Sequence, residues 1–297
     1  MTLRALYELP APAKLNLFLH VVGRRTDGYH LLQSLFVLID WCDTLHLERR
    51  DDGRLQRYDL GAALPADDLC LRAARLLQAA SGTPLGVDIS IHKRLPWGAG
   101  LGGGSSDAAT VLLGLNRLWG LHWSRERLIA LGTRLGADLP FFLFGQDAFV
   151  EGIGERLRPL TLPRQWYAVL KPAATLPTAQ IFNHAALERG TEAAIVEGSL
   201  DDVCRLMDWA GGYGRNDLQP AAESICPEVA QAARWLEASF GNSRMTGSGS
   251  AVFSRAGTGD LPLATLPAAP LAPGWEGRMC QGLGRHPLAD WAGESGF

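Results

Sequence analysis

The sequence contains little lysine and little cysteine. Of its 28 basic residues, 25 are arginine, and the three lysines are Lys14, Lys93 and Lys171. The five cysteines are scattered and never spaced as C-x-x-C, which argues against a disulfide framework or a structural zinc site and favours a reducing, cytoplasmic setting. Because an ammonium and a guanidinium differ in geometry, hydration and titratability, each lysine left in an arginine-rich chain is a candidate functional residue.

Long apolar runs and excess charge are also absent. No run approaches the roughly 20 apolar residues of a membrane helix, and the first residues lack the pattern of a signal peptide. The uncharged stretch 261–275 contains four prolines and is expected to be irregular. A net charge of −3 argues against non-specific nucleic-acid binding. We therefore expect neither a membrane nor a nucleic-acid partner. The 297 residues, 47% of them hydrophobic, suffice for one large or two ordinary globular domains.

Hydrophobic periodicity predicts strands and helices that are mixed along the chain without regular alternation. This pattern favours a two-domain α+β protein over a doubly wound sheet, with the boundary in the proline-containing segment 158–164. Asp27-Gly28 predicts a hairpin turn, and 50–57 is expected to be a loop. The predicted strands are 13–22, 31–40, 44–49, 87–92, 148–150, 166–172, 251–254 and 276–281. The predicted helices are 67–80, one from about 105, 124–135, 178–188, 200–210 and 227–239.

The segment 98–107 carries the strongest chemical signal. Its first seven positions hold five glycines, which leave backbone N–H groups unshielded, and an apolar helix follows with its positive dipole end toward them. Together these features predict a phosphate site. A flexible linker is the alternative, but a linker rarely runs straight into an apolar helix. Gly104 stands where a Walker A loop needs lysine, and a second helix follows where a dinucleotide fold needs a strand and an acidic residue.

Three motifs in order resemble the GHMP small-molecule kinases. They are Pro12-Ala13-Lys14-Leu15-Asn16, the loop Pro96 to Ser106, and the turn Met245 to Ser250. The resemblance extends from about Pro10 to Leu288. It implies a GHMP-kinase fold of the α+β class. Residues 1–160 would form an N-terminal ATP-binding α/β domain with a mixed sheet, and 161–297 a C-terminal ferredoxin-like α+β domain.

The resemblance also implies an activity. Such kinases transfer the γ-phosphoryl group of ATP, with Mg²⁺, to an alcohol. Segments 13–36, 135–145, 148–155 and 282–288 resemble the branch whose substrate is a cytidine diphosphate polyol. A homoserine- or mevalonate-type kinase is the alternative within the family. Outside the family the alternative is a non-catalytic nucleotide-binding or dinucleotide-dependent protein. We expect a cytoplasmic monomer or weak homodimer.

Two residues are expected to be catalytic through the resemblance. Lys14 would neutralise charge on the phosphoryl group, and strand alternation places it on one face with Asn16. Asp138, just past a predicted helix, would take or orient the hydroxyl proton, and a neighbouring Lys14 would favour its charged form. The alternatives are a solvated strand lysine and a turn-forming aspartate.

The residues expected to bind ATP comprise the glycine loop, the lysine before it and one aspartate before the first helix. They are Asp68, Lys93, Pro96, Trp97, Gly98, Ala99, Gly100, Leu101, Gly102, Gly103, Gly104, Ser105 and Ser106. A hydroxyl of Ser105 or Ser106 could reach Mg²⁺, and Ser106 is the candidate ligand. Trp97 and Ala99 stand where this branch usually has Met and Gly, and we expect them only to tune the site.

The resemblance places the second substrate on both predicted domains. Tyr29 and His30 would hold the cytosine by stacking and by reading its edge. Thr178 and Phe182, four residues apart on one predicted helix, would close over the nucleotide, although core packing is the alternative for Phe182. Gly247 and Ser248 would line the site, unless they form a plain turn. The expected substrate-binding residues are Asn16, Tyr29, His30, Thr178, Phe182, Gly247 and Ser248.

Overall fold

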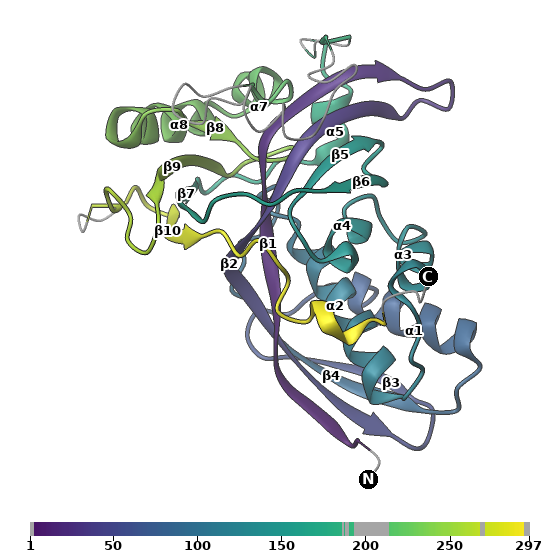
Figure 1. Ribbon diagram of the computed structural model, residues 1–297. Coiled ribbons are helices and arrows are strands. Elements are labelled where there is room, and N and C mark those ends of the chain that lie inside the picture. Colours follow the sequence, from purple (N-terminus) through teal and green to yellow (C-terminus); the bar gives the residue numbers. More distant parts are fainter. Residues whose placement is uncertain (1–2, 186, 188–189, 193–213, 268–270, 294–297) are drawn as a thin grey trace.

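Two β-sheets with helices packed against them form the molecule (Figure 1). The computed structural model describes residues 3–185, 187, 190–192, 214–267 and 271–293. The first sheet has six strands in the order β3-β4-β2-β5-β6, with β1 also paired to β2, and the second has four in the order β10-β7-β9-β8. Within the first sheet β3 runs parallel to β4, while the other pairs are antiparallel. The predicted α+β class with a mixed sheet is therefore confirmed.

The first sheet is built around one long hairpin. Strands β1 (Ala5–Arg24) and β2 (His30–Arg50) pair along their length, and the turn between them includes Gly28 at φ 92°. The first half of β2 also pairs with β5 (Ala148–Gly152), and its second half pairs with β4 (Gly86–His92). The predicted strands 31–40 and 44–49 are thus one strand. The predicted loop 50–57 is also partly wrong, because its end belongs to β3 (Leu55–Asp59).

The helices of the first half enclose the larger core. Helix α2 (Gly103–Leu118) is buried along almost its whole length and packs against β1 and β2. Its neighbours are α1 (Leu69–Ser81), α3 (Arg125–Gly132) and α4 (Leu139–Phe144). The predicted start and end of α1 are confirmed to within two residues, because Asp68 caps its first turn and Gly82 ends it. Helix α4 was not predicted, since six residues are too few to show a helical period.

The second sheet carries its own helices. It consists of β7 (Gln165–Lys171), β8 (Arg244–Met245), β9 (Val252–Thr258) and β10 (Glu276–Gln281). Helices α7 (Gln219–Ile225) and α8 (Pro227–Phe240) pack together, and α8 contacts β7 and β9. Helix α5 (Thr178–Phe182) begins where the predicted helix 178–188 begins, but it ends six residues earlier. The predicted helix 200–210 lies outside the described residues.

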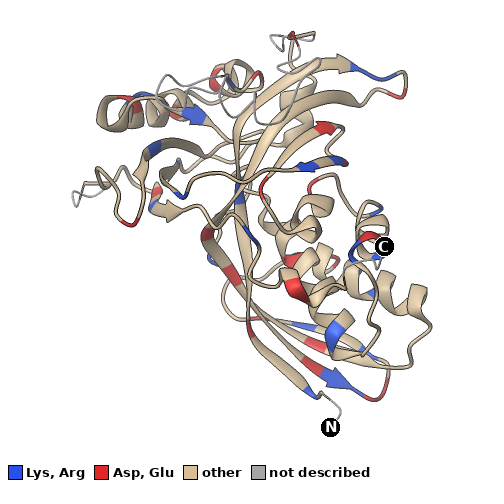
Figure 2. Cartoon of the chain, viewed as in Figure 1, with Lys and Arg blue, Asp and Glu red and all other residues tan. Residues whose placement is uncertain are grey.

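Arginine supplies paired charges at the far edge of the first sheet. Arg50 lies 2.5 Å from Asp52 and 2.9 Å from Asp88, and Arg57 lies 2.7 Å from Asp59 and 2.8 Å from Asp68. The planar, forked guanidinium can bind two carboxylates at once. Figure 2 shows basic and acidic residues interspersed over the chain. No helix among the described residues is long and apolar enough to cross a membrane.

The C-terminal segment returns from the second sheet to the first half of the molecule (Figure 1). Between β6 (Arg156–Pro159) and β7 the chain passes from the first sheet to the second, but residues 282–293 pack back near α3 and α4. The N–H of His286 donates to the Gly145 carbonyl at 2.9 Å, and the N–H of Asp147 donates to the Gly284 carbonyl at 3.1 Å. A domain division between residues 160 and 161 stays a prediction.

This return brings two buried titratable groups into the same region, with opposite shifts. Burial raises the pKa of Asp147 to about 7, although the Leu38 N–H donates to its carboxylate at 2.9 Å. Burial and then the nearby Arg125 charge lower the pKa of His286 to about 4. The contribution of Asp147 to the free energy of unfolding therefore decreases as pH rises from about 4 to 7. The contribution of His286 to the free energy of unfolding decreases as pH falls from about 6.5 to 4.

Removing Asp147 and removing His286 should change the slope of stability against pH in opposite directions. In urea unfolding between pH 5 and 6.5, we expect the free energy of unfolding of Asp147→Asn to rise more steeply with pH than wild type. That of His286→Asn should rise less steeply or fall, each slope changing by up to about 1.4 kcal/mol per pH unit. Asparagine retains an acceptor for the Leu38 and Leu288 N–H groups respectively. Slopes that shift in the same direction would contradict these assignments.

Candidate active site

One cavity of about 960 Å³ lies where the glycine loop, β1 and the turn after β8 meet. Lys14 and Asp138 line it, as do the remaining residues predicted from the sequence to bind either substrate, with the exception of Ser106. These residues come from segments that are more than 200 positions apart, such as Asn16 and Ser248. The fold therefore brings the predicted site residues together.

Backbone hydrogen bonds hold the glycine loop on both sides. The Lys14 N–H of β1 donates to the Leu101 carbonyl at 3.0 Å, and the Ala251 N–H donates to the Ala99 carbonyl at 3.0 Å. At Gly100, where φ is 74°, an added Cβ would lie 2.2 Å from the Thr246 carbonyl oxygen. Only glycine allows the loop to approach the turn so closely. Ala99 is not among the described non-glycine residues with positive φ, so its replacement of glycine brings no left-handed strain.

Lys14 is buried in the centre of the site. Its ammonium donates to the Asn16 side-chain oxygen, which confirms that the two share one face of β1. Asn16 is itself held by Ser34, whose Oγ accepts from Nδ2 at 3.0 Å, and by the Thr246 hydroxyl, which donates to Oδ1 at 3.2 Å. Burial lowers the pKa of Lys14, and the charge of Asp138 opposes that shift. A solvated strand lysine is therefore excluded.

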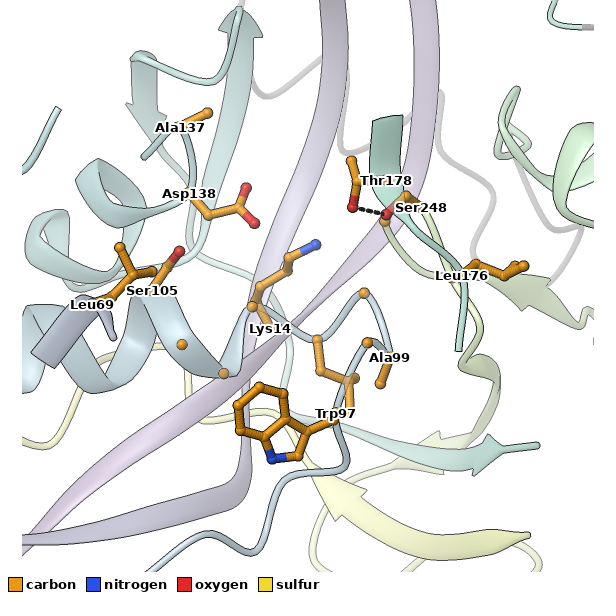
Figure 3. A pocket seen from close by; sticks show the side chains of 18 of the residues that line it. Lys14, Leu69, Trp97, Ala99, Ser105, Ala137, Asp138, Leu176, Thr178 and Ser248 are labelled. Carbon is orange, nitrogen blue, oxygen red and sulfur yellow. Dashed lines mark hydrogen bonds between the residues drawn. The ribbon is translucent and has the colours of Figure 1, made fainter. Parts of the chain in front are cut away.

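Asp138 precedes α4 and points toward Lys14 (Figure 3). Its side chain makes no capping hydrogen bond to the helix. The structure therefore does not support the alternative that Asp138 only stabilises a local turn. The helix begins at Leu139 immediately after Asp138, with Pro140 in the first turn, and the apolar residues Leu139 to Leu143 are buried. The carboxylate is thus carried on a rigid base and directed into the cavity.

The N-terminus of α2 has the features of an anion site. The helix begins at Gly103, and its N-cap is Gly102, which offers no side-chain acceptor to the first turn. The first N–H groups of a helix have no partner within it, so those of Gly103 and Gly104 remain available for a ligand. They line the cavity together with the Ser105 side chain. The partial positive charge of this helix end adds to the attraction for phosphate.

The prediction of Ser106 as an ATP or magnesium ligand is wrong. Its hydroxyl donates to the Pro12 carbonyl at 2.6 Å, its N–H donates to the Gly102 carbonyl at 2.9 Å, and the residue is fully buried. One step along a helix rotates a side chain by about 100°, so Ser106 faces β1 when Ser105 faces the cavity. Asp68 lines the cavity but already accepts from the Leu71 N–H at 3.1 Å and pairs with Arg57.

Lys93 lies at the base of the loop between two carboxylates. Its ammonium donates to Asp43 and, at 2.5 Å, to Asp107. Asp43 also accepts from the N–H groups of Arg94 and Leu95, at 2.5 and 2.8 Å, which fixes the chain entering the loop. Burial raises the pKa of Asp107, and Lys93 opposes that shift. Sequence reasoning missed Asp43, since nothing local marks an aspartate within a strand as a partner for position 93.

Aromatic rings form another wall of the cavity, at the tip of the long hairpin. The His30 and Phe182 rings lie 5.2 Å apart at 31°, and Tyr29 beside them is 60% exposed. The hydroxyls of Thr178 and Ser248 lie 2.8 Å apart and join α5 to the turn after β8 (Figure 3). Phe182 both packs against the core of the second sheet and lines the cavity, so core packing is confirmed, and its closing over the nucleotide stays a prediction.

The third lysine has a structural explanation. Lys171 is buried at the end of β7, and its ammonium donates to the Pro172 carbonyl at 2.6 Å and to the Ala174 carbonyl at 2.9 Å. It does not line the cavity. Lys171 therefore stabilises the segment that leads from β7 to α5.

Family models and relatives agree on where this chain belongs. The model described as "GHMP kinases N terminal domain" matches residues 68–146, and "GHMP kinases C terminal" matches residues 191–261. The 4-diphosphocytidyl-2-C-methyl-D-erythritol kinase of Methylibium petroleiphilum is 63% identical over 99% of this chain and all of its own. The enzyme of the same name from Paracidovorax citrulli is 54% identical over 98% of this chain and 99% of its own.

Solved structures give the same result. A crystal structure of 4-(cytidine 5'-diphospho)-2C-methyl-D-erythritol kinase matches with a TM-score of 0.70 and 38% identity, covering 84% of this chain and 90% of the other. Homoserine kinase from Cytophaga hutchinsonii matches with a TM-score of 0.60 and 17% identity, covering 86% of this chain and 85% of the other. The second similarity concerns the fold alone.

The Lys93 cluster can be tested by its charge balance. Lys93→Met would leave two buried carboxylates without their cation, and we expect the free energy of unfolding to fall by about 3–5 kcal/mol. Adding Asp107→Asn removes one of the two negative charges and should recover at least half of that loss. Urea titrations at pH 7 measure both. A double variant as unstable as Lys93→Met would show that charge balance is not what the cluster provides.

Proposed function

The chain belongs to the GHMP kinase family, and on that premise we propose that it phosphorylates the 2-hydroxyl of 4-diphosphocytidyl-2-C-methyl-D-erythritol with ATP. This reaction is a step of the non-mevalonate route to isoprenoid precursors. The proposal rests on one observation above all. A single cavity holds a backbone anion site, a buried lysine directed toward an aspartate, and a separate aromatic wall. Two nucleotides and one phosphoryl transfer need those three parts.

ATP is the phosphoryl donor, and we place its phosphates at the glycine loop. The N–H groups of Gly103 and Gly104 and the positive end of α2 would bind phosphate oxygens. Phosphoryl transfer depends mainly on positioning and on neutralising charge at the transferred group. The Lys14 ammonium, fixed by Asn16, would meet that charge at the point where β1 crosses the loop.

Asp138 would act on the acceptor. A carboxylate within hydrogen-bond reach of an alcohol can take its proton or orient its lone pair toward phosphorus. Asp138 enters the cavity near Lys14 (Figure 3). The 2-hydroxyl of the substrate would therefore lie between Asp138 and the γ-phosphoryl group.

The aromatic wall suits the cytosine base. Tyr29 offers an exposed ring face at the hairpin tip, and His30 and Phe182 form a tilted ring pair beside it. Aromatic faces bind bases by stacking, and a histidine can also hydrogen-bond a base edge. Thr178, Gly247 and Ser248 line the same cavity from the second sheet, where they would contact the rest of the cytidine nucleotide.

Mg²⁺ would accompany ATP and offset phosphate charge. Among the described residues no group of three or more His, Cys, Asp or Glu side chains could hold a metal by itself. The cavity does offer the Ser105 hydroxyl and the Asp138 carboxylate, and Mg²⁺ characteristically uses few protein ligands together with phosphates and water. These two residues fit an ion carried in by the nucleotide.

We further assign residues 1–160 to an ATP-binding domain and 161–297 to a domain that completes the substrate site. The two matched family models fall on either side of this division. We also propose a cytoplasmic enzyme that acts as a monomer or weak homodimer. One chain supplies the described walls of the cavity, and the scattered cysteines suit a reducing compartment.

The roles of Lys14 and Asp138 predict specific losses. We expect Lys14→Arg and Asp138→Asn each to lower kcat by about 100-fold or more, because neither preserves both the charge and the position of the reacting group. An arginine has little room here, since an added Cβ on Gly247 would already lie 3.1 Å from the lysine ammonium. Coupled ADP-release assays with both substrates saturating measure kcat, and circular dichroism checks the fold.

Lys171→Met is the matched control, because it removes a second buried lysine that lies outside the cavity. We expect it to lower the melting temperature while kcat stays within about twofold of wild type. A near-normal kcat in Lys14→Arg or Asp138→Asn would refute the role assigned to that residue.

A further inference from the structure

Ser34 is a buried polar residue of β2 to which the proposed mechanism gives no role. It is 1% exposed and does not line the cavity. It lies at an irregularity of the long hairpin. Asn16 pairs with Phe36, and the next pair, Leu19 with Ser34, lies three positions further along β1 but two along β2. The extra residue on β1 forms a bulge, which disrupts the regular ladder and re-aims the side chains beside it.

The Ser34 hydroxyl makes one hydrogen bond as a donor and one as an acceptor. It donates to the Phe18 carbonyl in the bulged segment, and it accepts from Nδ2 of Asn16 at 3.0 Å. A hydroxyl has a single hydrogen, and a carbonyl oxygen can only accept. Because that hydrogen is given to Phe18, the Ser34 oxygen can face the NH2 group of Asn16 but not its side-chain oxygen.

This restriction determines which way round the Asn16 amide lies. The two ends of a carboxamide have nearly the same shape, so their positions follow from their partners. With Nδ2 at Ser34, Oδ1 points to the Lys14 ammonium, which has only donors. The Thr246 hydroxyl, 3.2 Å from Oδ1, does not decide the orientation, because a hydroxyl can donate to an oxygen or accept from an NH2 group.

We infer that Ser34 is a positioning residue for phosphoryl transfer, which holds the Asn16 amide so that its oxygen faces Lys14. The inference rests on the proposed function, because it takes the Lys14 ammonium to meet the transferred phosphoryl group. An ammonium has three donors, so one can remain on Oδ1 while another binds a phosphate oxygen. Each hydrogen bond in the chain from Phe18 through Ser34 to Asn16 polarises the next, which makes Oδ1 a better acceptor.

The surroundings of the Lys14 ammonium make this acceptor important. Burial lowers the pKa of Lys14, and Asp138 is the charged group that opposes the shift. Its other neighbours, the Phe36 ring with its centroid 5.0 Å away and Gly247 after β8, are uncharged, and the first turn of α2 has no acidic residue. Without Ser34 the amide can turn its NH2 group toward the ammonium, which disfavours the charged form.

Kinetics separate positioning from a purely structural role. We expect Ser34→Ala to lower kcat by about tenfold or more, while the KM values for ATP and the cytidyl substrate change less than about threefold. Ser34→Thr retains the hydroxyl and should keep kcat within about threefold of wild type. The matched control is Ser254→Ala, which removes another fully buried serine hydroxyl, on β9 outside the cavity. It should change kcat less than about twofold. A kcat of Ser34→Ala within that same range overturns the inference.

The scarcity of lysine allows a direct readout that needs no turnover. In protein labelled with carbon-13 at the lysine Cε, only Lys14, Lys93 and Lys171 give side-chain signals, and the Lys14 signal is the one absent from Lys14→Arg. In Ser34→Ala we expect this signal to titrate at a lower pH than in wild type, because the ammonium has lost an oriented acceptor. The other two lysines should titrate as in wild type. An unchanged Lys14 titration overturns the inference.

A double variant shows whether Ser34 acts through Asn16. If it does, adding Ser34→Ala to Asn16→Ala should lower kcat less than about twofold further, because the amide that Ser34 orients is already gone. Losses that multiply fully in the double variant contradict the inference.

These outcomes separate the inference from the proposed function. If wild type forms the phosphorylated product but Lys14 titrates normally in Ser34→Ala, the positioning role is refuted and the kinase stands. If Lys14 titrates at lower pH in Ser34→Ala but wild type does not phosphorylate the cytidyl substrate, the orientation of Asn16 by Ser34 stands and the proposed acceptor is wrong.

Discussion

The hydrogen bonds that clamp the glycine loop between β1 and the turn after β8 are the constraint on which the site depends. They bring Lys14, the N-terminus of α2 and Ser248 to one cavity, although these lie in three distant parts of the sequence. The contact is possible because Gly100 has no side chain against the Thr246 carbonyl. A loop fixed on both sides presents its N–H groups in a set geometry, which a phosphoryl-transfer site needs more than it needs reactive side chains.

The three lysines of this chain have three different roles. Lys14 is held by an amide oxygen and directed at a cavity, so its charge is available to a ligand. Lys93 forms ion pairs with Asp43 and Asp107 and thereby fixes the chain that enters the loop. Lys171 binds backbone carbonyls at the end of β7. Arginine, with its wide fork, would fit such small sites poorly, which gives the scarcity of lysine a physical meaning.

The sequence predicted those features whose cause is local. Helix α1 was predictable because Asp68 and Gly82 mark its ends, and the loop because its glycines precede an apolar helix. Features with distant causes were not. Strand β2 continues through Asp40 and Asp43 because the Gln281 N–H donates to the Asp40 carboxylate and the Arg94 N–H donates to the Asp43 carboxylate. Ser106 faces inward because of a partner at Pro12.

The central claim is that the cavity transfers one phosphoryl group from ATP to the 2-hydroxyl of a cytidine diphosphate polyol. The most direct test incubates the wild-type protein with Mg²⁺-ATP and 4-diphosphocytidyl-2-C-methyl-D-erythritol and follows the products by phosphorus NMR. The account predicts equal amounts of ADP and of a product with a new phosphate ester at the 2-hydroxyl, and no comparable turnover of homoserine or mevalonate. ADP formed at the same rate without the cytidyl substrate would contradict it.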